Sequence, residues 1–181
     1  VLGLSGGFRV VIFNIIFAFL LWLYSHKFKK MLFMGDLMAS LLTVSSFLVV
    51  SIYFYSLPSL IIIYALFIFI VELIRELVKD LEGIKGDLIM NYSSIPLKYG
   101  IKNTKILISV LFVLLPLPFW IFYEAMGLHP LNYFFIPALI LAGICWILLI
   151  KSKNQRDYKR VHLLIKLLIV CGILALPILS L

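Results

Sequence analysis

Long apolar runs alternate with short polar links along almost the whole chain. Six runs are long enough to cross a bilayer as helices, each close to the ~20 residues that span a ~30 Å hydrocarbon core. They cover residues 8–24, 32–55, 59–79, 106–123, 131–150 and 161–181. Lipid cannot satisfy the hydrogen bonds of an open sheet edge, so the pattern predicts helices throughout. We therefore expect one polytopic, all-α integral membrane domain over residues 1–181, with six transmembrane helices.

The composition excludes a water-soluble protein. Hydrophobic residues make up 64% of the 181 positions and charged residues only 13%, and the mean hydropathy is +1.17. A soluble domain of this size could not bury so much apolar surface. The two cysteines, Cys145 and Cys171, lie inside apolar runs and are interpreted as buried thiols rather than metal ligands.

The charges between the runs predict an orientation. Lysine and arginine concentrate in the segments 25–31, 75–105 and 151–160, whereas the links 56–59 and 124–132 contain neither. By the positive-inside rule the three basic segments are cytoplasmic, which places both chain ends on the far side of the membrane. The net charge of +8 is then explained by topology and anionic lipid, so we expect membrane lipid as a partner and no nucleic acid.

Acidic residues gather at the end of the third run. Five of the eight carboxylates in the chain lie between positions 72 and 87: Glu72, Glu76, Asp80, Glu82 and Asp87. The first three are spaced by four residues and share one helical face. Like charges at this spacing repel by a few tenths of a kcal/mol, and an acid near the bilayer centre costs roughly 2.5–3.5 kcal/mol.

We expect positive charge to offset these acids. Arg75, Lys79 and Lys85 are close in sequence, and a divalent cation held by oxygen ligands would complete the compensation. A simpler interpretation also stands: a helix that emerges into water near residue 78 carries mixed charges on a wet face and binds nothing. That interpretation fits Glu82 better than Glu72 or Glu76, which lie inside the apolar run.

Two stretches carry a family resemblance. "RELVKDLEGIKGD" at 75–87, followed by "SSIPLKYG" at 93–100, resembles the second aspartate-rich motif of UbiA-type intramembrane prenyltransferases. It is most similar to the branch that makes digeranylgeranylglyceryl phosphate. "WLYSHKFKKMLFMGDLMASLLT" at 22–43 is similar to the tyrosine-and-lysine link and following helix of that family. The resemblance implies helices four to nine of a nine-helix bundle, and we expect an odd number of helices ahead of Val1.

The resemblance also implies a chemistry. The reaction is the Mg²⁺-dependent transfer of a polyprenyl group from a prenyl diphosphate to a lipid-like acceptor. The implied acceptor is a prenylated glycerol phosphate or a quinone precursor, and the implied location is a prokaryotic cell membrane. Carried onto this sequence, the catalytic and metal-binding residues are Asp87, Asp80 and Glu76. The residues implied to bind the donor diphosphate are Arg75, Lys79, Lys85, Tyr24, Lys27 and Lys29.

Other assignments stay open. The rings of Tyr64, Phe67 and Phe69 are candidates to stabilise an allylic cation through their π-faces, although aromatic residues in membrane helices more often serve packing. His129 is interpreted as an ordinary interfacial residue.

The sequence departs from the family pattern in three ways. The first aspartate-rich motif of the family, N-D-x-x-D, does not occur in these 181 residues. Gly83 stands where the family usually has an aspartate, so the D-x-x-x-D pair keeps only Asp87. Asp36 and Ser93 stand where the family often has Asn and a basic residue. We therefore expect the 181-residue chain alone to be inactive, and we retain the alternative of a non-catalytic isoprenoid-binding or transport-type membrane protein.

Overall fold

The computed structural model describes residues 8–28, 31–53, 59–126 and 132–175, with side chains over 8–28, 31–46, 61–124 and 133–172. Within these ranges every regular element is a helix, as the hydrophobic pattern predicts. The helices are α2 (Phe8–His26), α3 (Met34–Tyr53), α4 (Ser59–Ile89), α5 (Ile95–Leu114), α6 (Pro116–Met126), α7 (Asn132–Lys151) and α8 (Gln155–Ala175).

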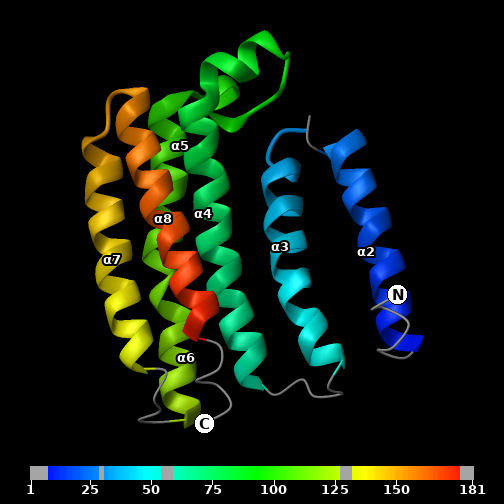
Figure 1. Cartoon of the computed structure of the whole chain (residues 1–181). Helices are drawn as coiled ribbons and strands as arrows, with labels where there is room; N and C mark the ends of the chain where they lie inside the picture. The colour runs from blue at the N-terminus through cyan, green and yellow to red at the C-terminus, as the bar shows by residue number, and fades with distance from the viewer. Residues whose placement is uncertain (1–7, 29–30, 54–58, 127–131, 176–181) are drawn as a thin grey trace.

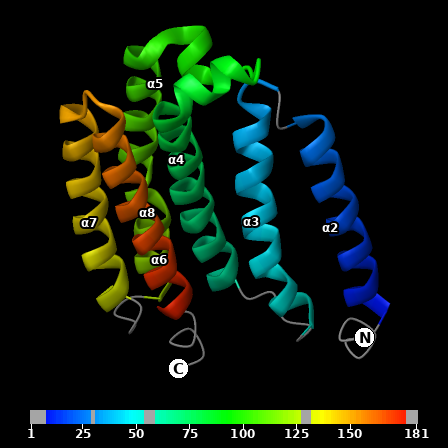
Figure 2. The same cartoon turned by 45° about the horizontal axis from the view of Figure 1, so that its top comes forward.

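Successive helices run in alternating directions, with α5 and α6 together forming one traverse (Figure 1). The links from α2 to α3, from α4 to α5 and from α7 to α8 all lie at the end drawn uppermost, as a second view also shows (Figure 2). We call this end the basic end, because it carries the three segments rich in Lys and Arg. The alternation predicted from the charges is therefore present, while its assignment to the cytoplasmic side stays a prediction.

Helix α4 continues about three turns past the predicted end at residue 79 and stops at Ile89. The added residues include Leu, Glu and Lys, which favour a helix strongly enough to carry it through two glycines. The helix ends just before Asn91, whose φ of 53° is one that Asn tolerates better than most residues. Its charged end is consequently a rigid extension of the apolar part.

The predicted run 106–123 is divided between two helices. Pro116 begins α6 and has no amide hydrogen to donate to the preceding turn, so the hydrogen-bond ladder of α5 ends there. Helix α5 also begins earlier than predicted, at Ile95, and is kinked at Gly100, where φ is 83°. A residue without a side chain suits this backbone conformation.

Three helical segments among the described residues are long and apolar enough to cross a membrane: Phe8–His26, Ile95–Glu124 and Tyr133–Lys151. The all-helical membrane class is therefore supported, and the count of six spans stays a prediction. Large apolar side chains face outward on these segments, for example Phe19 and Ile140, as expected for surfaces that contact lipid.

Helix α4 is the centre of the fold and packs against α3, α5, α6 and α8. Tyr64 donates a hydrogen bond from its hydroxyl to the carbonyl of Gly172 on α8. Phe67 is fully buried and meets Phe135 edge-to-face, with ring centroids 5.2 Å apart. Tyr64 and Phe67 thus serve packing in the core, and Phe69 is partly buried against the same core.

Candidate functional site

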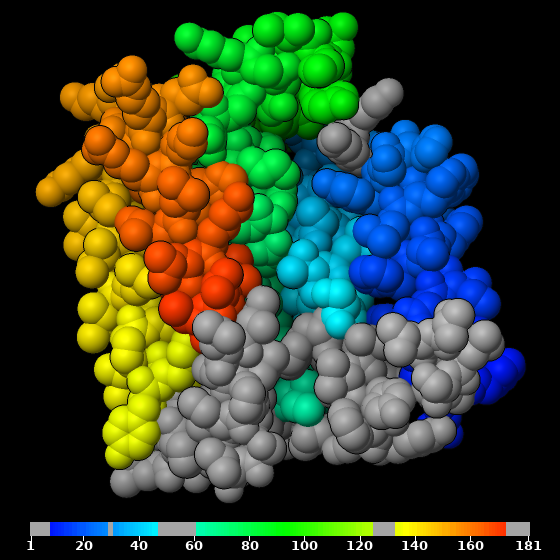
Figure 3. Space-filling model, in the orientation of Figure 1, coloured from blue at the N-terminus to red at the C-terminus, as the bar shows by residue number. Residues whose placement is uncertain are grey.

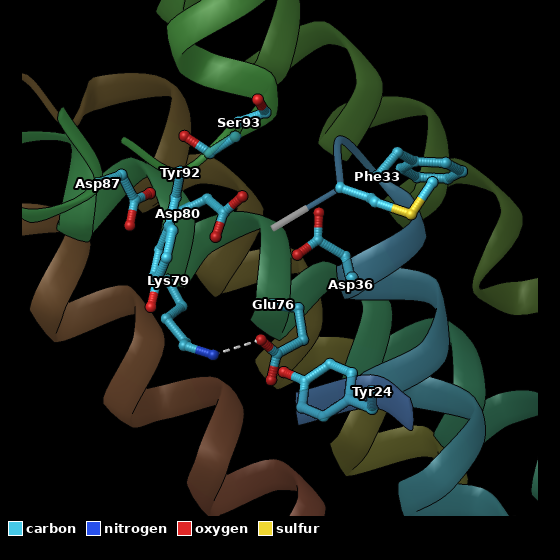
Figure 4. A pocket seen from close by; sticks show the side chains of 12 residues that line it. Tyr24, Phe33, Asp36, Glu76, Lys79, Asp80, Asp87, Tyr92 and Ser93 are labelled. Carbon is cyan, nitrogen blue, oxygen red and sulfur yellow. Dashed lines mark hydrogen bonds and ion pairs between the residues drawn. The ribbon is translucent and has the colours of Figure 1, made fainter. Parts of the chain in front are cut away.

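A cavity of about 100 Å³ lies at the basic end, between α2, α3, α4 and the link into α5 (Figure 4). It is lined by Tyr24, Met31, Phe33, Gly35, Asp36, Glu76, Lys79, Asp80, Asp87, Tyr92, Ser93 and Ser94. Four of these residues are acidic, and Lys79 is the one Lys or Arg among the described residues of the lining. An anionic cavity at the end of a largely apolar helix such as α4 indicates a functional site rather than packing.

Helix α4 supplies most of the charge. Glu76, Asp80 and Asp87 are spaced by four and seven residues, which places all three on one face of a helix, and all three line the cavity. The aspartate Asp36 comes from the opposite wall, in the first turn of α3. The three residues predicted to be catalytic and metal-binding therefore lie together, and a fourth acid faces them.

The acids deeper in α4 are compensated by Arg75. Its Nε donates to Glu72 Oε2 at 2.8 Å and its Nη2 donates to Glu72 Oε1 at 2.6 Å. The same Nη2 also donates to Glu76. Thr43 on α3 donates from Oγ1 to Glu72 Oε1 at 3.2 Å. Glu72 and Glu76 are buried, so these contacts supply the positive charge and hydrogen bonds that such acids require.

Lys79 presents its charge to the cavity. Its Nζ donates to Glu76 Oε2 at 2.6 Å, and its side chain is half exposed. Glu76 is thereby held at both oxygens, one by Arg75 and the other by Lys79. In this arrangement Glu76 orients Lys79, and both carboxylate oxygens of Glu76 already accept a hydrogen bond.

The three aspartates of the lining differ from Glu76, whose carboxylate is held by Arg75 and Lys79. Among the described residues, the carboxylates of Asp36, Asp80 and Asp87 have no hydrogen-bond or ion-pair partner. Asp36 and Asp87 both repel the charge on Asp80, and Lys79 attracts it only in part. Asp36 is buried and Asp80 and Asp87 are half-buried, and removing anionic groups from water without a partner is unfavourable, so the cavity favours a bound cation.

The described residues do not enclose a metal ion by themselves, because no three acidic, histidine or cysteine side chains among them converge on one point. Mg²⁺ in particular binds one or two carboxylates and completes its shell with phosphate oxygens and water. The oxygen ligands of the cavity therefore fit a Mg²⁺ ion shared with a phosphate group better than a closed protein site.

The residues predicted to bind a diphosphate are only partly brought together. Tyr24 and Lys79 line the cavity, whereas Arg75 lies behind its wall with 16% of its side chain exposed. Lys27 and Lys85 are exposed and do not line the cavity. Lys29 and His129 lie outside the described residues. The roles of all six diphosphate-binding candidates stay predictions.

Sequence reasoning missed Asp36 and Ser94 as members of the lining. Asp36 is the sole acid within the run 32–55, which is a signal in itself because acids are rare in membrane segments. Ser94 occupies the N-cap position of α5, yet its hydroxyl makes no capping bond. This hydroxyl oxygen, Oγ, is the buried side-chain polar atom that has no hydrogen-bond partner in the described part of the chain.

A second polar contact joins α4 to α8. The Nδ1 of His162 lies 2.7 Å from Glu82 Oε2, and its Nε2 lies 3.5 Å from Nη1 of Arg75. Arginine can only donate, so Nε2 accepts and the ring proton lies on Nδ1, from which it is donated to Glu82. Glu82, interpreted above as a solvated acid, is therefore partly buried and paired with a residue 80 positions away.

Comparisons with known proteins agree with the residues that suggested a resemblance. The sequence profile described as the UbiA prenyltransferase family matches residues 1–172. A digeranylgeranylglyceryl phosphate synthase of Saccharolobus solfataricus is 31% identical over 158 residues, covering 84% of this chain and 54% of that protein. One of Methanocaldococcus jannaschii is 30% identical over 169 residues, covering 86% and 54%.

A solved structure has a similar fold. It is described as "Structural and mechanistic insights into the biosynthesis of Digeranylgeranylglyceryl phosphate synthase in membranes", and it superposes with a TM-score of 0.69 at 28% identity. The match covers 96% of this chain and 62% of that one. The chain thus spans about half the length of the curated relatives that it matches.

Proposed function

The chain belongs to the UbiA prenyltransferase family, and on that premise we propose that it carries the diphosphate-binding half of an intramembrane prenyltransferase. The observation that supports this proposal is the cavity at the basic end, which is lined by Lys79 and by three aspartates without a partner among the described residues, Asp36, Asp80 and Asp87. A site that binds a metal–diphosphate group needs both carboxylates and a cation. The cavity supplies both from rigid helices.

The residues of the chain divide the work of binding. Asp80 and Asp87, with Glu76 beside them, would hold Mg²⁺, and the bound ion would neutralise charge that develops on the leaving diphosphate. Lys79 would exchange its contact with Glu76 for one with a diphosphate oxygen and stabilise the same charge. Arg75 keeps the Glu76 carboxylate in place from behind, and the phenol of Tyr24 lines the same cavity.

The prenyl tail of the donor needs an apolar path. In the space-filling view, α4 is recessed between α8 and the pair α2–α3 below the basic end (Figure 3). Ile62 and Leu66 on α4 have exposed apolar side chains. We propose that a polyprenyl chain extends from the cavity along this recess, with its diphosphate among the aspartates. The allylic carbon next to the diphosphate is then the atom that the acceptor attacks.

The relatives suggest the substrates. They are named digeranylgeranylglyceryl phosphate synthases, so we propose a geranylgeranyl diphosphate donor and a prenylated glycerol phosphate acceptor. A quinone precursor is the alternative acceptor, because the residues of the cavity would bind the donor diphosphate and do not select the acceptor. We place the basic end in the cytoplasm of a prokaryotic cell, by the positive-inside rule.

Transfer itself is tested with both substrates. The chain is purified into liposomes with Mg²⁺, radiolabelled geranylgeranyl diphosphate and geranylgeranylglyceryl phosphate. It is assayed alone and together with the part of the Saccharolobus solfataricus synthase that this chain does not match. We expect product only in the combined sample, because the chain covers about half of that protein. Absence of product in both samples would contradict the proposed transfer.

Gly83 favours a second candidate function. An aspartate is missing there from the family pattern, and a chain with weak metal binding could instead hold an isoprenoid lipid without transferring it. This candidate predicts prenyl diphosphate binding that does not depend on Mg²⁺. Binding measured with and without EDTA separates the two candidates.

A further inference from the structure

Asp36 is a buried acid with no described partner. It lies in the first turn of α3, and only 9% of its surface is exposed. Neither an ion pair nor a hydrogen bond of its carboxylate is found among the described residues. In the close-up the carboxylate points from α3 across the cavity toward Asp80 (Figure 4). A buried carboxylate charge in this position destabilises the protein unless a cation binds next to it.

Ser94 gives an independent indication of a ligand. It lines the same cavity from the link into α5, and it is 6% exposed. Its Oγ has no hydrogen-bond partner in the described part of the chain. A buried hydroxyl without a partner is rare in proteins. Its proton is available to an oxygen of a phosphate or of a metal-bound water in the cavity.

Gly83 explains why a further carboxylate would be needed. A Cβ atom added at Gly83 would lie 4.0 Å from Asp87 Oδ1, so an aspartate there would stand beside Asp87. Glycine leaves that position empty of ligand atoms. Asp36 lines the same cavity as Asp87, but it comes from helix α3, whereas Gly83 and Asp87 lie on α4.

We propose that Asp36 supplies, from α3, an additional carboxylate for a divalent-cation and diphosphate group that is held between it and Asp80 and Asp87, whose side chains do not converge on one point by themselves. It takes the place of the ligand that Gly83 does not provide, and the Ser94 hydroxyl donates to an oxygen of the bound group. The inference deepens the proposed function and rests on it. The ligand class is a Mg²⁺-bound diphosphate, of which inorganic pyrophosphate is the simplest member.

Asp36 also has a purely structural explanation that the test must separate. An acid in the first turn of a helix interacts favourably with the helix dipole. Asn is a good residue near a helix start but carries no charge. Asp36→Asn therefore removes the metal ligand and the charge while it preserves the size and hydrogen-bonding ability of the side chain.

The experiment uses the 181-residue chain in detergent micelles, with Mn²⁺ as the probe and inorganic pyrophosphate present. Electron paramagnetic resonance measures free Mn²⁺. We expect Asp36→Asn to weaken Mn²⁺ binding roughly tenfold, as loss of a metal-site partner commonly does. Adding Gly83→Asp to Asp36→Asn should restore most of the lost affinity. Asp157→Asn, in the first turn of α8 and outside this cavity, is the matched control and should change nothing.

The outcomes separate this inference from the proposed function. If Asp87→Asn abolishes Mn²⁺ binding and Asp36→Asn leaves it unchanged, the role of Asp36 is overturned and the proposed function stands. If the unmodified chain binds no Mn²⁺ with pyrophosphate, both are overturned. Gly83→Asp in the otherwise unmodified chain keeps the inference testable if Asp36→Asn fails to fold. Tighter Mn²⁺ binding is then expected, because the added carboxylate lies beside Asp87. Unchanged affinity would contradict the claim that the site lacks a ligand at position 83.

Discussion

Arg75 donates two parallel hydrogen bonds to Glu72, from Nε to Oε2 at 2.8 Å and from Nη2 to Oε1 at 2.6 Å. The pair lies one turn deeper in α4 than the cavity, and a third bond from the guanidinium reaches Glu76. Bidentate pairs of this kind are strong and fix the orientation of both groups. Arg75 thus positions the charged side of the cavity instead of lining it.

Removing Arg75 should destabilise the fold. Arg75→Leu leaves two buried carboxylates, Glu72 and Glu76, without their main partner, and breaking a buried pair in this way costs about 3–5 kcal/mol. Thermal unfolding in detergent should show a clearly lowered Tm. The matched control is Lys79→Leu, which removes a half-exposed partner of Glu76 and should cost no more than about 1 kcal/mol. Equal losses in the two variants would contradict the assignment of Arg75 as the buried support.

Lys79 should matter for ligand binding more than for stability. Lys79→Gln removes the cation that lines the cavity, and a hydrogen bond to a charged group contributes about 1.5–3 kcal/mol, which is roughly a 10- to 150-fold change in affinity. Isothermal titration with pyrophosphate and Mg²⁺ measures the change. Lys85→Gln is the control, because Lys85 is exposed outside the lining. A larger loss for Lys85→Gln than for Lys79→Gln would place the diphosphate elsewhere.

His162 should stabilise the contact between α4 and α8. His162→Phe keeps a ring but leaves Glu82 without its donor, and we expect the free energy of unfolding to fall by about 1–3 kcal/mol. His162→Gln can still donate to Glu82 and should lose less. Chemical unfolding of both variants in the same detergent compares them. If the Phe and Gln variants are equally stable, the hydrogen bond to Glu82 contributes nothing.

Gly172 permits the close approach of α8 to α4. A Cβ atom there would lie 3.0 Å from the hydroxyl oxygen of Tyr64 and 3.1 Å from Cδ1 of Ile68. Gly172→Ala should therefore cost about 1–3 kcal/mol through overpacking, measured as a lowered Tm. In a chain that already carries Tyr64→Phe, the hydroxyl is gone and the cost of Gly172→Ala should be smaller. An unchanged cost would show that the crowding does not involve that hydroxyl.

The parts of this architecture that follow from local pattern could be predicted from the sequence. The apolar runs place the helices, and the spacing of Glu76, Asp80 and Asp87 places three cavity residues on one face of α4. Helix boundaries were less accessible, because α4 continues through residues whose polarity suggested an end of the span while their helix propensity remains high.

Contacts between helices could not be predicted from spacing. Asp36 faces Asp80 from another helix, and His162 meets Glu82 from a position 80 residues away. Nothing in the local sequence fixes such pairings, since they depend on how the helices pack. The same reason explains Arg75, which the family resemblance placed among the diphosphate ligands and which the fold places behind the cavity wall.

Mg²⁺-dependent binding of geranylgeranyl diphosphate to the chain in liposomes, compared between the unmodified chain and Asp87→Ala, tests the central claim most directly. Asp87 lines the cavity and has no described ion-pair partner, so the variant should insert into the membrane normally and lose the Mg²⁺-dependent part of binding. Binding by Asp87→Ala that is as strong and as Mg²⁺-dependent as that of the unmodified chain would contradict the claim that this cavity holds the donor diphosphate.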